Sequence, residues 1–574
     1  MKRTLGYLRN YLRESILAPL FKLLEAIFEL TVPLVIAAII DRGIEGNGGT
    51  PLILGYAGIL VLLAAVGFLV AVVAQYFAAK AAVGAGTDIR RDLFRRVQSM
   101  NYADLDKNGT ATLLTRLSGD TDRVQSGINM ALRLFLRSPF IVFGAMIMAF
   151  TVDRESAVIF AVLIPLLFLA VFAILLLTVP LYTRVQKRLD GVLRKTRENL
   201  RGARVVRAFG MEERETAEFD GDNNALLAMQ RVAGRISALL NPLTLLLVNA
   251  AVILLIYTGA LRIEETGMST GELVALYNYM SQILVELVKL ANLVITSTRA
   301  VASAKRIGAV LTMDNILPEK TVTPDRPRDA LVEFSRVSFR YPSATEDTLT
   351  GIDFTARRGE TIGVIGGTGS GKSSLVSLIP HFYDATDGCV LVDGVNVQDI
   401  PDDVLRARIG YVPQKSVLFR GSIRKNLCFR KENATDGELW DAVRIAQATE
   451  VVENKGGLDA VIEENGQNLS GGQRQRLCIA RALVGDPDIL ILDDSASALD
   501  YATDARLRAA LTRLPDDPLI FIVSQRVASV RNADRIIVLD DGKAVGIGKH
   551  DELLRSCPVY AEIVASQTKK EDEA

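Results

Sequence analysis

Histidine and cysteine are scarce in this chain, and their scarcity removes several classes of site. The 574 residues include two histidines, His381 and His550, and four cysteines. Two histidines so far apart argue against a metal site built on imidazole ligands. The cysteines are also widely spaced and match no metal-ligand pattern, so we expect reduced thiols in the core of a cytosolic domain. These cysteines are Cys389, Cys428, Cys478 and Cys557.

The chain also lacks an excess of charge of either sign. Its 66 lysines and arginines balance 66 aspartates and glutamates. Zero net charge provides no global field to attract nucleic acid, so we expect no nucleic-acid partner. Apolar residues make up 49% of the chain and charged residues 23%. This mixture indicates a membrane half joined to a soluble half, and the length predicts at least two domains.

Six long apolar segments occupy the first half of the sequence. Each approaches the roughly 20 residues that cross the hydrocarbon of a bilayer. A large soluble protein buries one or two such segments, but hardly six. We therefore expect an all-α transmembrane domain with six spanning helices over residues 15–312. The apolar segments lie near residues 16–40, 52–83, 128–152, 156–182, 240–261 and 272–297.

The connections between these segments predict the orientation of the chain. Residues 89–123 and 184–207 are rich in lysine and arginine, whereas the other connections are short and mostly acidic. Positive charge stays inside, so we expect a multi-pass cell-membrane protein with both termini and the soluble half in the cytoplasm. The helical spacing of both basic stretches predicts that the spanning helices continue beyond the membrane. Their turns, near Met100 to Asp106 and Arg207 to Glu215, are expected to rest on another domain.

Composition predicts the remaining boundaries. Met1 to Glu14 combines basic and apolar residues, and we expect an amphipathic elbow helix on the cytoplasmic membrane surface rather than a signal peptide. Residues 313–328 are rich in Pro, Thr, Asp and Lys, which predicts a linker. Residues 329–568 alternate apolar strands with helical stretches, as in a soluble α/β domain. Residues 569–574 form a charged tail.

Charged residues inside the apolar segments cost free energy and need an explanation. Lys22, Glu25 and Glu29 share one helical face of the first segment, and Glu286 and Lys289 lie one turn apart in the sixth. An ionised group at mid-membrane costs about 2.5–3.5 kcal/mol on insertion scales, so these side chains should face one another or a wet cavity. They either pair helices together or contact substrate. The candidates for a substrate cavity are Glu25, Glu29, Glu286 and Lys289.

A glycine-rich loop dominates the soluble half. Gly366 to Ser373 reads G-G-T-G-S-G-K-S, follows the apolar strand Thr361 to Ile365, and precedes a helical stretch. In that context the backbone N–H groups turn toward phosphate oxygens, Lys372 reaches the β- and γ-phosphates, and the Ser373 hydroxyl takes a Mg²⁺ position. The expected phosphate-binding residues are Gly366, Gly367, Thr368, Gly369, Ser370, Gly371, Lys372, Ser373 and Ser374.

Two later motifs complete the chemistry of a nucleoside triphosphate site. Ile489 to Asp494 reads as a buried strand that ends in two carboxylates, and the first of them, Asp493, is placed to hold Mg²⁺ directly or through water. Upstream of that strand, two glycines and a serine at a helix start form a second anion-binding nest. This second nest consists of Ser470, Gly471, Gly472 and Gln473.

Together these motifs resemble an ATP-binding cassette (ABC) transporter of the exporter type, and the resemblance covers nearly the whole chain. It implies a six-helix transmembrane domain of the type I exporter fold, also called type IV, fused to an α/β P-loop nucleotide-binding domain. It further implies that Tyr341 stacks on adenine, and that Ser497 to Asp500 cross a dimer interface. It also implies that Gln414 senses the γ-phosphate and the membrane domain and belongs to the Mg²⁺ site. Two such domains close head to tail, and each ATP lies between the phosphate loop of one and the Leu-Ser-Gly-Gly-Gln segment of the other.

The chain departs from the family pattern at two positions that carry hydrolysis. The family usually has glutamate after the Mg²⁺ aspartate, whereas this chain has Asp494. Its carboxylate is one methylene, about 1.5 Å, further back, and an error of 1 Å can cost about 10²-fold in rate. Where the family has a histidine near the γ-phosphate, this chain has Gln525, which carries no titrating charge near neutral pH. The groups that bind ATP are kept, while those that hydrolyse it are weakened.

This asymmetry predicts a heterodimer. A different half-transporter with the family's glutamate and histidine would use Ser470 to Gln473 of this chain to complete its own active site. The pair would export amphipathic or hydrophobic substrates such as drugs, lipids or peptides through the lipid bilayer. Three alternatives remain open: a homodimeric exporter with slow ATPase activity, an importer built on the exporter fold, and a regulatory membrane protein gated by ATP.

Overall fold

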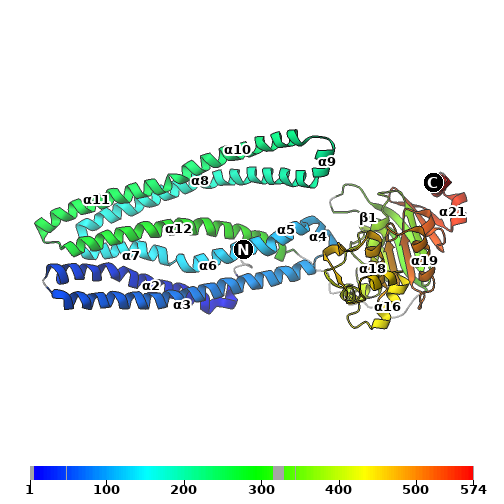
Figure 1. Cartoon of the computed structure of the whole chain (residues 1–574), viewed down its shortest axis with the longest axis horizontal. Coiled ribbons are helices and arrows are strands. Elements are labelled where there is room, and N and C mark those ends of the chain that lie inside the picture. The colour runs from blue at the N-terminus through cyan, green and yellow to red at the C-terminus, as the bar shows by residue number, and fades with distance from the viewer. Residues whose placement is uncertain (1–5, 47, 314–328, 343, 573–574) are drawn as a thin grey trace. The chain divides into compact units, whose positions relative to one another are not determined.

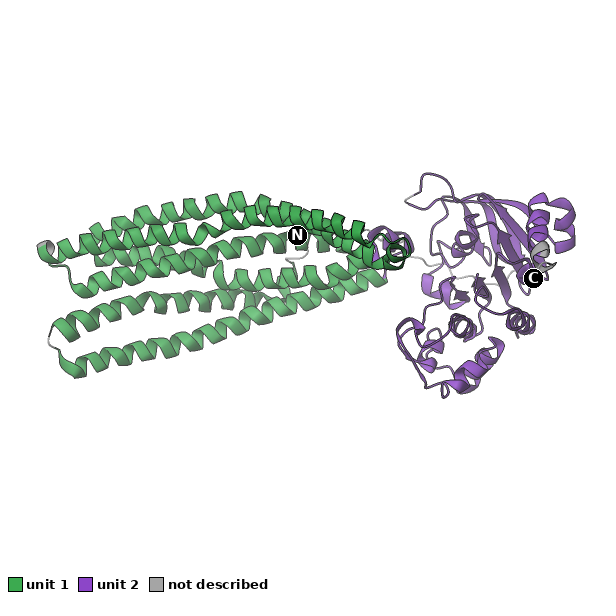
Figure 2. Ribbon diagram, turned by 45° about the horizontal axis from the view of Figure 1, so that its top comes forward, with its two compact units in different colours: residues 1–98, 111–313 green, residues 99–110, 314–574 purple. Residues whose placement is uncertain are grey.

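The computed structural model describes residues 6–46, 48–313, 329–342 and 344–572. It divides into two compact units, which Figure 2 colours separately. Unit 1 comprises residues 1–98 and 111–313, and unit 2 comprises residues 99–110 and 314–574. Almost all of the expected linker, 313–328, lies outside the described residues.

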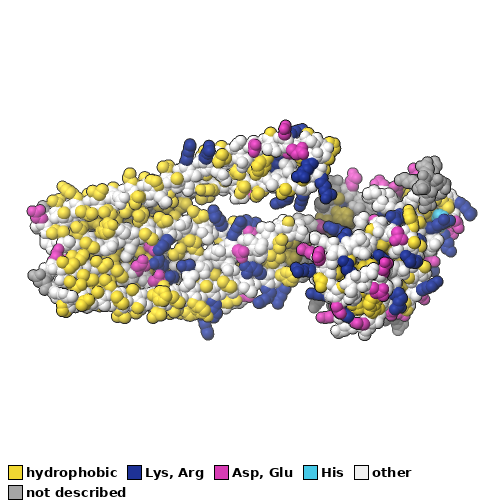
Figure 3. Space-filling model, viewed as in Figure 1, with side chains coloured by type: hydrophobic (Ala, Val, Ile, Leu, Met, Phe, Trp, Pro, Cys, Tyr) yellow, Lys and Arg dark blue, Asp and Glu magenta, His cyan; other side chains and the backbone are white. Residues whose placement is uncertain are grey.

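Unit 1 confirms the six expected spanning helices. Among the residues that the structure describes, six helical stretches of 39 to 53 residues are long and apolar enough to cross a membrane. Each is far longer than the roughly 20 residues that hydrocarbon requires, so the helices extend beyond the apolar layer as predicted. In Figure 3, hydrophobic side chains cover the end of unit 1 where α11 meets α12, and lysine and arginine side chains gather away from that end.

The helices of unit 1 are labelled in Figure 1 where space allows. Two short stretches, η2 and η3, are π-helical, and η1 is a 3₁₀-helix. The bounds are η1 Tyr7–Tyr11, α2 Leu12–Ala38, η2 Ile39–Glu45, α3 Gly49–Gln98, α5 Thr110–Thr115, η3 Arg116–Asp120, α6 Thr121–Leu134, α7 Arg137–Val152, α8 Arg154–Arg201, α9 Ala203–Ala208, α10 Glu212–Ala238, α11 Leu240–Thr266 and α12 Thr270–Leu311.

Small residues let the helices of unit 1 approach closely. The buried face of α3 consists largely of alanine, and a side chain at Gly84 would lie 2.3 Å from the Tyr11 ring. This glycine therefore provides the space in which η1 packs against α3. The contact is fixed by the Tyr7 hydroxyl, which donates to Asp92 at 2.6 Å, and by an ion pair of 2.9 Å between Glu14 and Lys80. The N-terminal segment thus lies along α3 before α2 begins.

Unit 2 contains two main sheets and a helical region. A four-stranded antiparallel sheet has the order β2-β1-β4-β5, and a six-stranded sheet has the order β12-β11-β3-β10-β9-β6, in which only β12 is antiparallel. The strand bounds are β1 Ala330–Phe339, β2 Leu349–Arg357, β3 Thr361–Gly366, β4 Asp387–Val392, β5 Val395–Asn396, β6 Ile409–Val412, β7 Gly421–Ser422, β8 Val461–Ile462, β9 Ile489–Asp493, β10 Leu519–Val523, β11 Arg535–Asp540 and β12 Lys543–Gly548.

Two cores lie on opposite faces of the six-stranded sheet. Ile489 and Ile491 of β9 belong to the core shared with the four-stranded sheet, while Leu490 and Leu492 pack among the helices. A parallel strand buried on both faces explains the uninterrupted apolar sequence of β9. The helix bounds in unit 2 are α4 Tyr102–Asn108, α13 Lys372–Ser377, α14 Asp402–Ala407, α15 Ile423–Leu427, α16 Asp436–Ile445, α17 Thr449–Asn454, η4 Glu464–Gly466, α18 Gly471–Leu483, α19 Tyr501–Leu511, α20 Val527–Val530, α21 His550–Ser556 and α22 Pro558–Asp572.

The short helix α4 belongs to unit 2 although it connects two helices of unit 1. The Tyr102 ring stacks on Phe382 with 4.3 Å between ring centroids, and the Tyr383 hydroxyl donates to Asp106 at 2.7 Å. This confirms that the turn near Met100 to Asp106 rests on the soluble domain.

Three smaller observations concern the turn between α9 and α10, the C-terminal helix and the cysteines. The other turn expected to rest on a domain, Arg207 to Glu215, connects α9 with α10 inside unit 1, and its contact with another domain stays a prediction. Helix α22 continues to Asp572, so the first residues of the expected tail, 569–574, are helical. All four cysteines are free thiols, and two of them, Cys478 and Cys557, are buried.

Candidate functional site

Four neighbouring parallel strands end at one edge of the six-stranded sheet, and the predicted motifs lie at or just after these strand ends. The order β3-β10-β9-β6 places the ends of these strands side by side. The phosphate loop follows β3, Ser524 and Gln525 follow β10, Asp493 ends β9, and Gln414 lies two residues beyond β6. Ligands of open α/β sheets bind at the carboxyl ends of the strands. The fold therefore gathers residues from positions 366 to 525 into one site.

The phosphate loop has the backbone conformation that its glycines predict. Gly369 and Gly371 have φ angles of 85° and 94°, which residues with side chains rarely adopt. A Cβ at Gly366 would lie 2.1 Å from the carbonyl oxygen of Leu539, so this glycine is required for close packing. The Lys372 Nζ donates to the carbonyl oxygens of Gly366 and Gly367 at 2.9 and 2.6 Å. Its ammonium thus lies within the loop that would surround the phosphates.

Burial is the largest influence on the pKa of the lysine in this loop. It lowers the pKa of Lys372, and the carboxylates of Asp494 and Asp493 act in the opposite direction. A phosphate group would add negative charge beside this ammonium and favour its protonated form.

Asp493 and Ser373 form the candidate Mg²⁺ position. The Ser373 hydroxyl donates to Oδ1 of Asp493 at 2.9 Å, and Asp493 is only 3% exposed. Burial raises the pKa of Asp493, the hydrogen bond from Ser373 lowers it, and the neighbouring charge of Asp494 raises it again. Two oxygen atoms that converge in this way suit a hard cation such as Mg²⁺, whose charge would stabilise the ionised carboxylate.

The resemblance assigns two further residues, Tyr341 and Gln414, to the nucleotide. Tyr341 follows β1, and its hydroxyl lies 2.9 Å from the Ser374 hydroxyl. Its ring contacts Phe339 and Tyr383 edge-on and is partly exposed. Gln414 is exposed beyond β6. The roles of both residues in binding the nucleotide stay predictions.

The second nest forms the start of α18. The Ser470 hydroxyl accepts from the backbone N–H of Gln473 at 3.3 Å, and the Gln473 side chain accepts from the Ser470 N–H at 2.9 Å. This reciprocal cap begins the helix. Gln475 then bonds Ser497 and the N–H of Ala498, at 3.2 and 3.0 Å. The helix start is thereby fixed to the loop that the resemblance places at a dimer interface, and its exposed first residue, Ser470, faces outward from the domain.

Asp494 directly follows the candidate Mg²⁺ ligand Asp493, and Gln525 lies two residues beyond β10. Asp494 has a left-handed φ of 47°, and its backbone N–H donates to the carbonyl of Val523 on β10 at 3.0 Å. This hydrogen bond holds the backbone of Asp494 beside β10. The effect of its shorter side chain on hydrolysis stays a prediction. Gln525 is exposed, and its backbone carbonyl oxygen accepts from the side-chain amide of Gln567 at 2.8 Å.

Sequence reasoning missed Tyr411 of β6. Its hydroxyl donates to Oδ2 of Asp493 at 3.4 Å. The residue lies three positions before Gln414 and has the side chain of an ordinary strand residue. The sequence alone carried no signal for this contact, because it depends on the pairing of β6 with β9.

Sequence reasoning also missed the central residue of the charged cluster in unit 1. Arg137 begins α7 and is 7% exposed. Its guanidinium contacts Glu286 at 2.7 Å, Glu29 at 2.5 Å and Glu25 at 3.8 Å. Glu286 also accepts from Ser138 and from Lys289, each at 2.7 Å. An arginine within an apolar stretch was the available signal.

The charged cluster balances its own charge and joins three helices. It contains three glutamates and three basic residues, drawn from α2, α7 and α12, and Lys22 pairs with Glu25 on α2. The ion pairs thus join the helices, which is one of the two roles expected for these charged residues. Contact between substrate and these residues stays a prediction.

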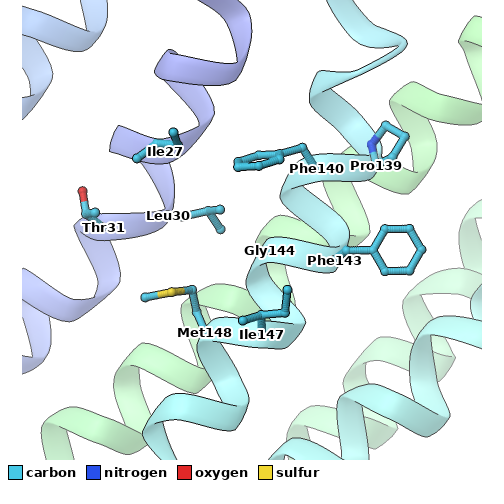
Figure 4. A pocket seen from close by; sticks show the side chains of 9 residues that line it. All are labelled: Ile27, Leu30, Thr31, Pro139, Phe140, Phe143, Gly144, Ile147 and Met148. Carbon is cyan, nitrogen blue, oxygen red and sulfur yellow. The ribbon is translucent and has the colours of Figure 1, made fainter.

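An apolar pocket lies beside this cluster between α2 and α7. Its volume is about 480 Å³, and Figure 4 shows the side chains that line it. The lining residue Leu30 directly follows Glu29 of the cluster, and Pro139 directly follows Ser138, which donates to Glu286. The lining residues are Ile27, Leu30, Thr31, Pro139, Phe140, Phe143, Gly144, Ile147 and Met148.

Comparisons with known proteins define the class. Residues 15–287 match the family model of the ABC transporter transmembrane region, and residues 349–497 match that of the ABC transporter. An uncharacterized ABC transporter ATP-binding protein of Mycobacterium tuberculosis is 36% identical over 571 residues, which cover 98% of this chain and 97% of the relative. The chain therefore belongs to the ABC transporter family, and its second domain is the ATP-binding domain that couples ATP hydrolysis to transport.

Further relatives define the group more closely. YfiB of Bacillus subtilis is 36% identical over 100% of this chain and 99% of its own length. The ATP-dependent lipid A-core flippase of Salmonella typhimurium is 31% identical over 83% of this chain and 82% of its own length. A bacterial Atm1-family ABC exporter with ATP bound has a similar structure, with a TM-score of 0.79, 23% identity and 98% of both chains covered. The chain thus has the type IV exporter fold.

Proposed function

We propose that this chain is one half of a heterodimeric ABC exporter and contributes a degenerate ATP site. The proposal depends on a contrast between two sets of residues at the same edge of the six-stranded sheet. Lys372 donates to the backbone of the phosphate loop, and Ser373 donates to Asp493, so the side chains that suit ATP and Mg²⁺ are present and in place. Asp494 and Gln525 stand where glutamate and histidine would support hydrolysis. ATP binds at this site and is hydrolysed slowly.

The competent site belongs to the partner and is completed by this chain. The start of α18 is intact, because Ser470 and Gln473 form its cap and Gln475 fixes it to the interface loop. Backbone N–H groups at such a helix start favour a phosphate group. The partner supplies its own phosphate loop, together with the glutamate and histidine that this chain lacks.

Exposed apolar side chains supply further contacts for the partner. Phe419 and Phe429 of unit 2 are stacked at 5.1 Å and are 52% and 66% exposed. At the end of α9 in unit 1, Val205 and Phe209 are 60% and 76% exposed. Aromatic residues exposed to this extent favour protein contacts. We assign both patches to the interface with the second half, in line with the expected docking of Arg207 to Glu215.

The substrate class follows from the membrane domain. The pocket between α2 and α7 is lined by apolar side chains, and the charged cluster around Arg137 lies beside it. Such a combination suits an amphipathic molecule with an apolar body and a polar end. Some relatives are named as lipid A-core flippases, which supports a lipid or another amphipathic compound as the substrate of this chain. Export implies that both termini and unit 2 lie in the cytoplasm, as the basic stretches predict.

The purified chain alone is expected to bind ATP and to hydrolyse it slowly. Binding of a fluorescent ATP analogue should be saturable and should be lost in Lys372→Ala, because that substitution removes the ammonium within the phosphate loop. Steady-state ATPase should be about 10²-fold below that of a competent exporter assayed alike, since the carboxylate of Asp494 lies too far back. Turnover equal to that of a competent exporter would contradict the proposal. ATP-driven accumulation of an amphipathic probe in inside-out vesicles would separate export from import.

A further inference from the structure

Asp493 is held through both of its carboxylate oxygens. Oδ1 accepts from Ser373 at 2.9 Å, and Oδ2 accepts from the phenol of Tyr411 at 3.4 Å. The strand register explains the second contact, because β6 lies beside β9 and Tyr411 pairs with Ile491. A carboxylate that ligates a metal is oriented by the groups that bond its remaining oxygen. Ser373 belongs to the metal position itself, so Tyr411 is the group that bonds Asp493 from outside it.

The ring of Tyr411 is itself held by a series of aromatic contacts. Phe382 meets Tyr411 edge-to-face, with centroids 5.1 Å apart and planes at 87°. Phe382 in turn stacks on Tyr102 of α4 at 4.3 Å. Three successive contacts therefore link α4, which follows the membrane helix α3, with Asp493: Tyr102 with Phe382, Phe382 with Tyr411, and Tyr411 with the carboxylate. All three rings belong to unit 2.

The middle ring of this series has little freedom to move independently. The Arg406 guanidinium lies 5.6 Å from the Phe382 centroid and donates to the carbonyl oxygens of Pro380 and His381, each at 3.1 Å. His381 has a φ of 53°, and its ring nitrogens bond carboxylates of two acidic residues. The backbone around Phe382 is thus fixed on one side. The Phe382 ring is therefore held in place between Tyr102 and Tyr411.

We propose that Tyr411 is a positioning residue for the metal ligand Asp493, and that the series Tyr102, Phe382 and Tyr411 transmits the position of α4 to that carboxylate. The inference rests on the proposed ATP and Mg²⁺ site. It adds a connection between α4 and the metal position that does not use Gln414. The hydroxyl of Tyr411 orients Asp493, and the ring contacts determine where that hydroxyl lies. Simple core packing predicts that the ring matters and that the hydroxyl does not.

Tyr411→Phe separates these two explanations. The full-length chain is saturated with a non-hydrolysable ATP analogue, and Mn²⁺ binding is followed by electron paramagnetic resonance, which reads the metal without any turnover. We expect the Kd for Mn²⁺ to rise about 10-fold in Tyr411→Phe, because loss of an orienting partner typically costs 10- to 100-fold in metal affinity. The melting temperature should change little. Tyr560→Phe provides the matched control, since it deletes a hydroxyl that bonds His550 at 2.7 Å, away from the sheet edge.

A double-mutant cycle tests the aromatic series. Tyr102→Leu removes the stacked ring and should also raise the Kd for Mn²⁺, by about threefold, while adding little in the Tyr411→Phe background, because coupled residues are non-additive. Additive effects, or no effect of Tyr102→Leu, would overturn the transmission. An unchanged Kd in Tyr411→Phe would overturn the positioning role. If the unsubstituted chain binds no Mn²⁺ with the analogue, the proposed ATP site itself fails, which is a different outcome.

Discussion

Replacing Asp494 by glutamate and Gln525 by histidine together is expected to raise the ATPase rate of the purified chain by about 10²-fold or more. The glutamate returns the carboxylate about 1.5 Å toward the position of the attacking water, where an error of 1 Å can cost about 10²-fold. The histidine restores a group that titrates near neutral pH and can bond the γ-phosphate. The site around them needs no rebuilding, because the phosphate loop, Ser373 and Asp493 are already in place.

The assay uses proteoliposomes at high protein density, with dimer formation followed by light scattering. Each single replacement should give much less than the pair, because groups that act as a unit are strongly non-additive. Lys372→Ala in the doubly substituted chain should abolish the gain and serves as the control for contaminating ATPase. A doubly substituted chain that forms dimers, binds ATP and shows less than a threefold gain would contradict the degenerate-site explanation.

Replacing Arg137 by methionine is expected to destabilise unit 1 by about 3–5 kcal/mol, which is the usual cost of removing one partner from a buried ion pair. The substitution leaves Glu286, which is 2% exposed, without the guanidinium that contacts it at 2.7 Å. Glu29 and Glu25 lose the same partner. The melting temperature in detergent should therefore fall by roughly 10 °C, since 1 kcal/mol shifts it by about 2–4 °C in domains of this order of size.

Two further variants identify the cause of this destabilisation. Arg299→Met makes the same change at an exposed position of α12 and should leave the melting temperature within about 2 °C. Arg137→Met combined with Glu286→Gln should recover part of the stability, because the buried charge that lost its partner is removed as well. Equal melting temperatures for Arg137→Met and the unsubstituted chain would show that the charged cluster does not hold α2, α7 and α12 together.

The nucleotide site was predictable because its signals are local. The strand, glycine loop and helix start around Lys372 form one continuous stretch, and the strand that ends at Asp493 carries its own apolar pattern. Parallel pairing then placed these separate motifs side by side. The six spanning helices were predictable for the same reason, since each is a single long apolar run.

Contacts between distant segments were not predictable in the same way. Arg137 lies 108 positions from Glu29 and 149 from Glu286, so only the packing of three helices brings them together. The approach of Tyr411 to Asp493 requires knowing that β6 pairs with β9. In both cases the residue types were visible in the sequence, but the partner was set by tertiary structure. The other charged residues of the cluster could therefore be named from the sequence, but the central position of Arg137 among them could not be predicted.

The most direct test compares two substitutions in this chain within the transporter that co-purifies from membranes. Asp494→Asn alters the chain's own site, and Ser470→Arg blocks the start of α18, which under the proposed function completes the partner's site. We predict that Asp494→Asn changes the ATPase rate of the assembled transporter by less than about twofold, whereas Ser470→Arg reduces it about 10²-fold or more. Equal and near-complete loss in both variants, in an assembly of identical chains, would contradict the account.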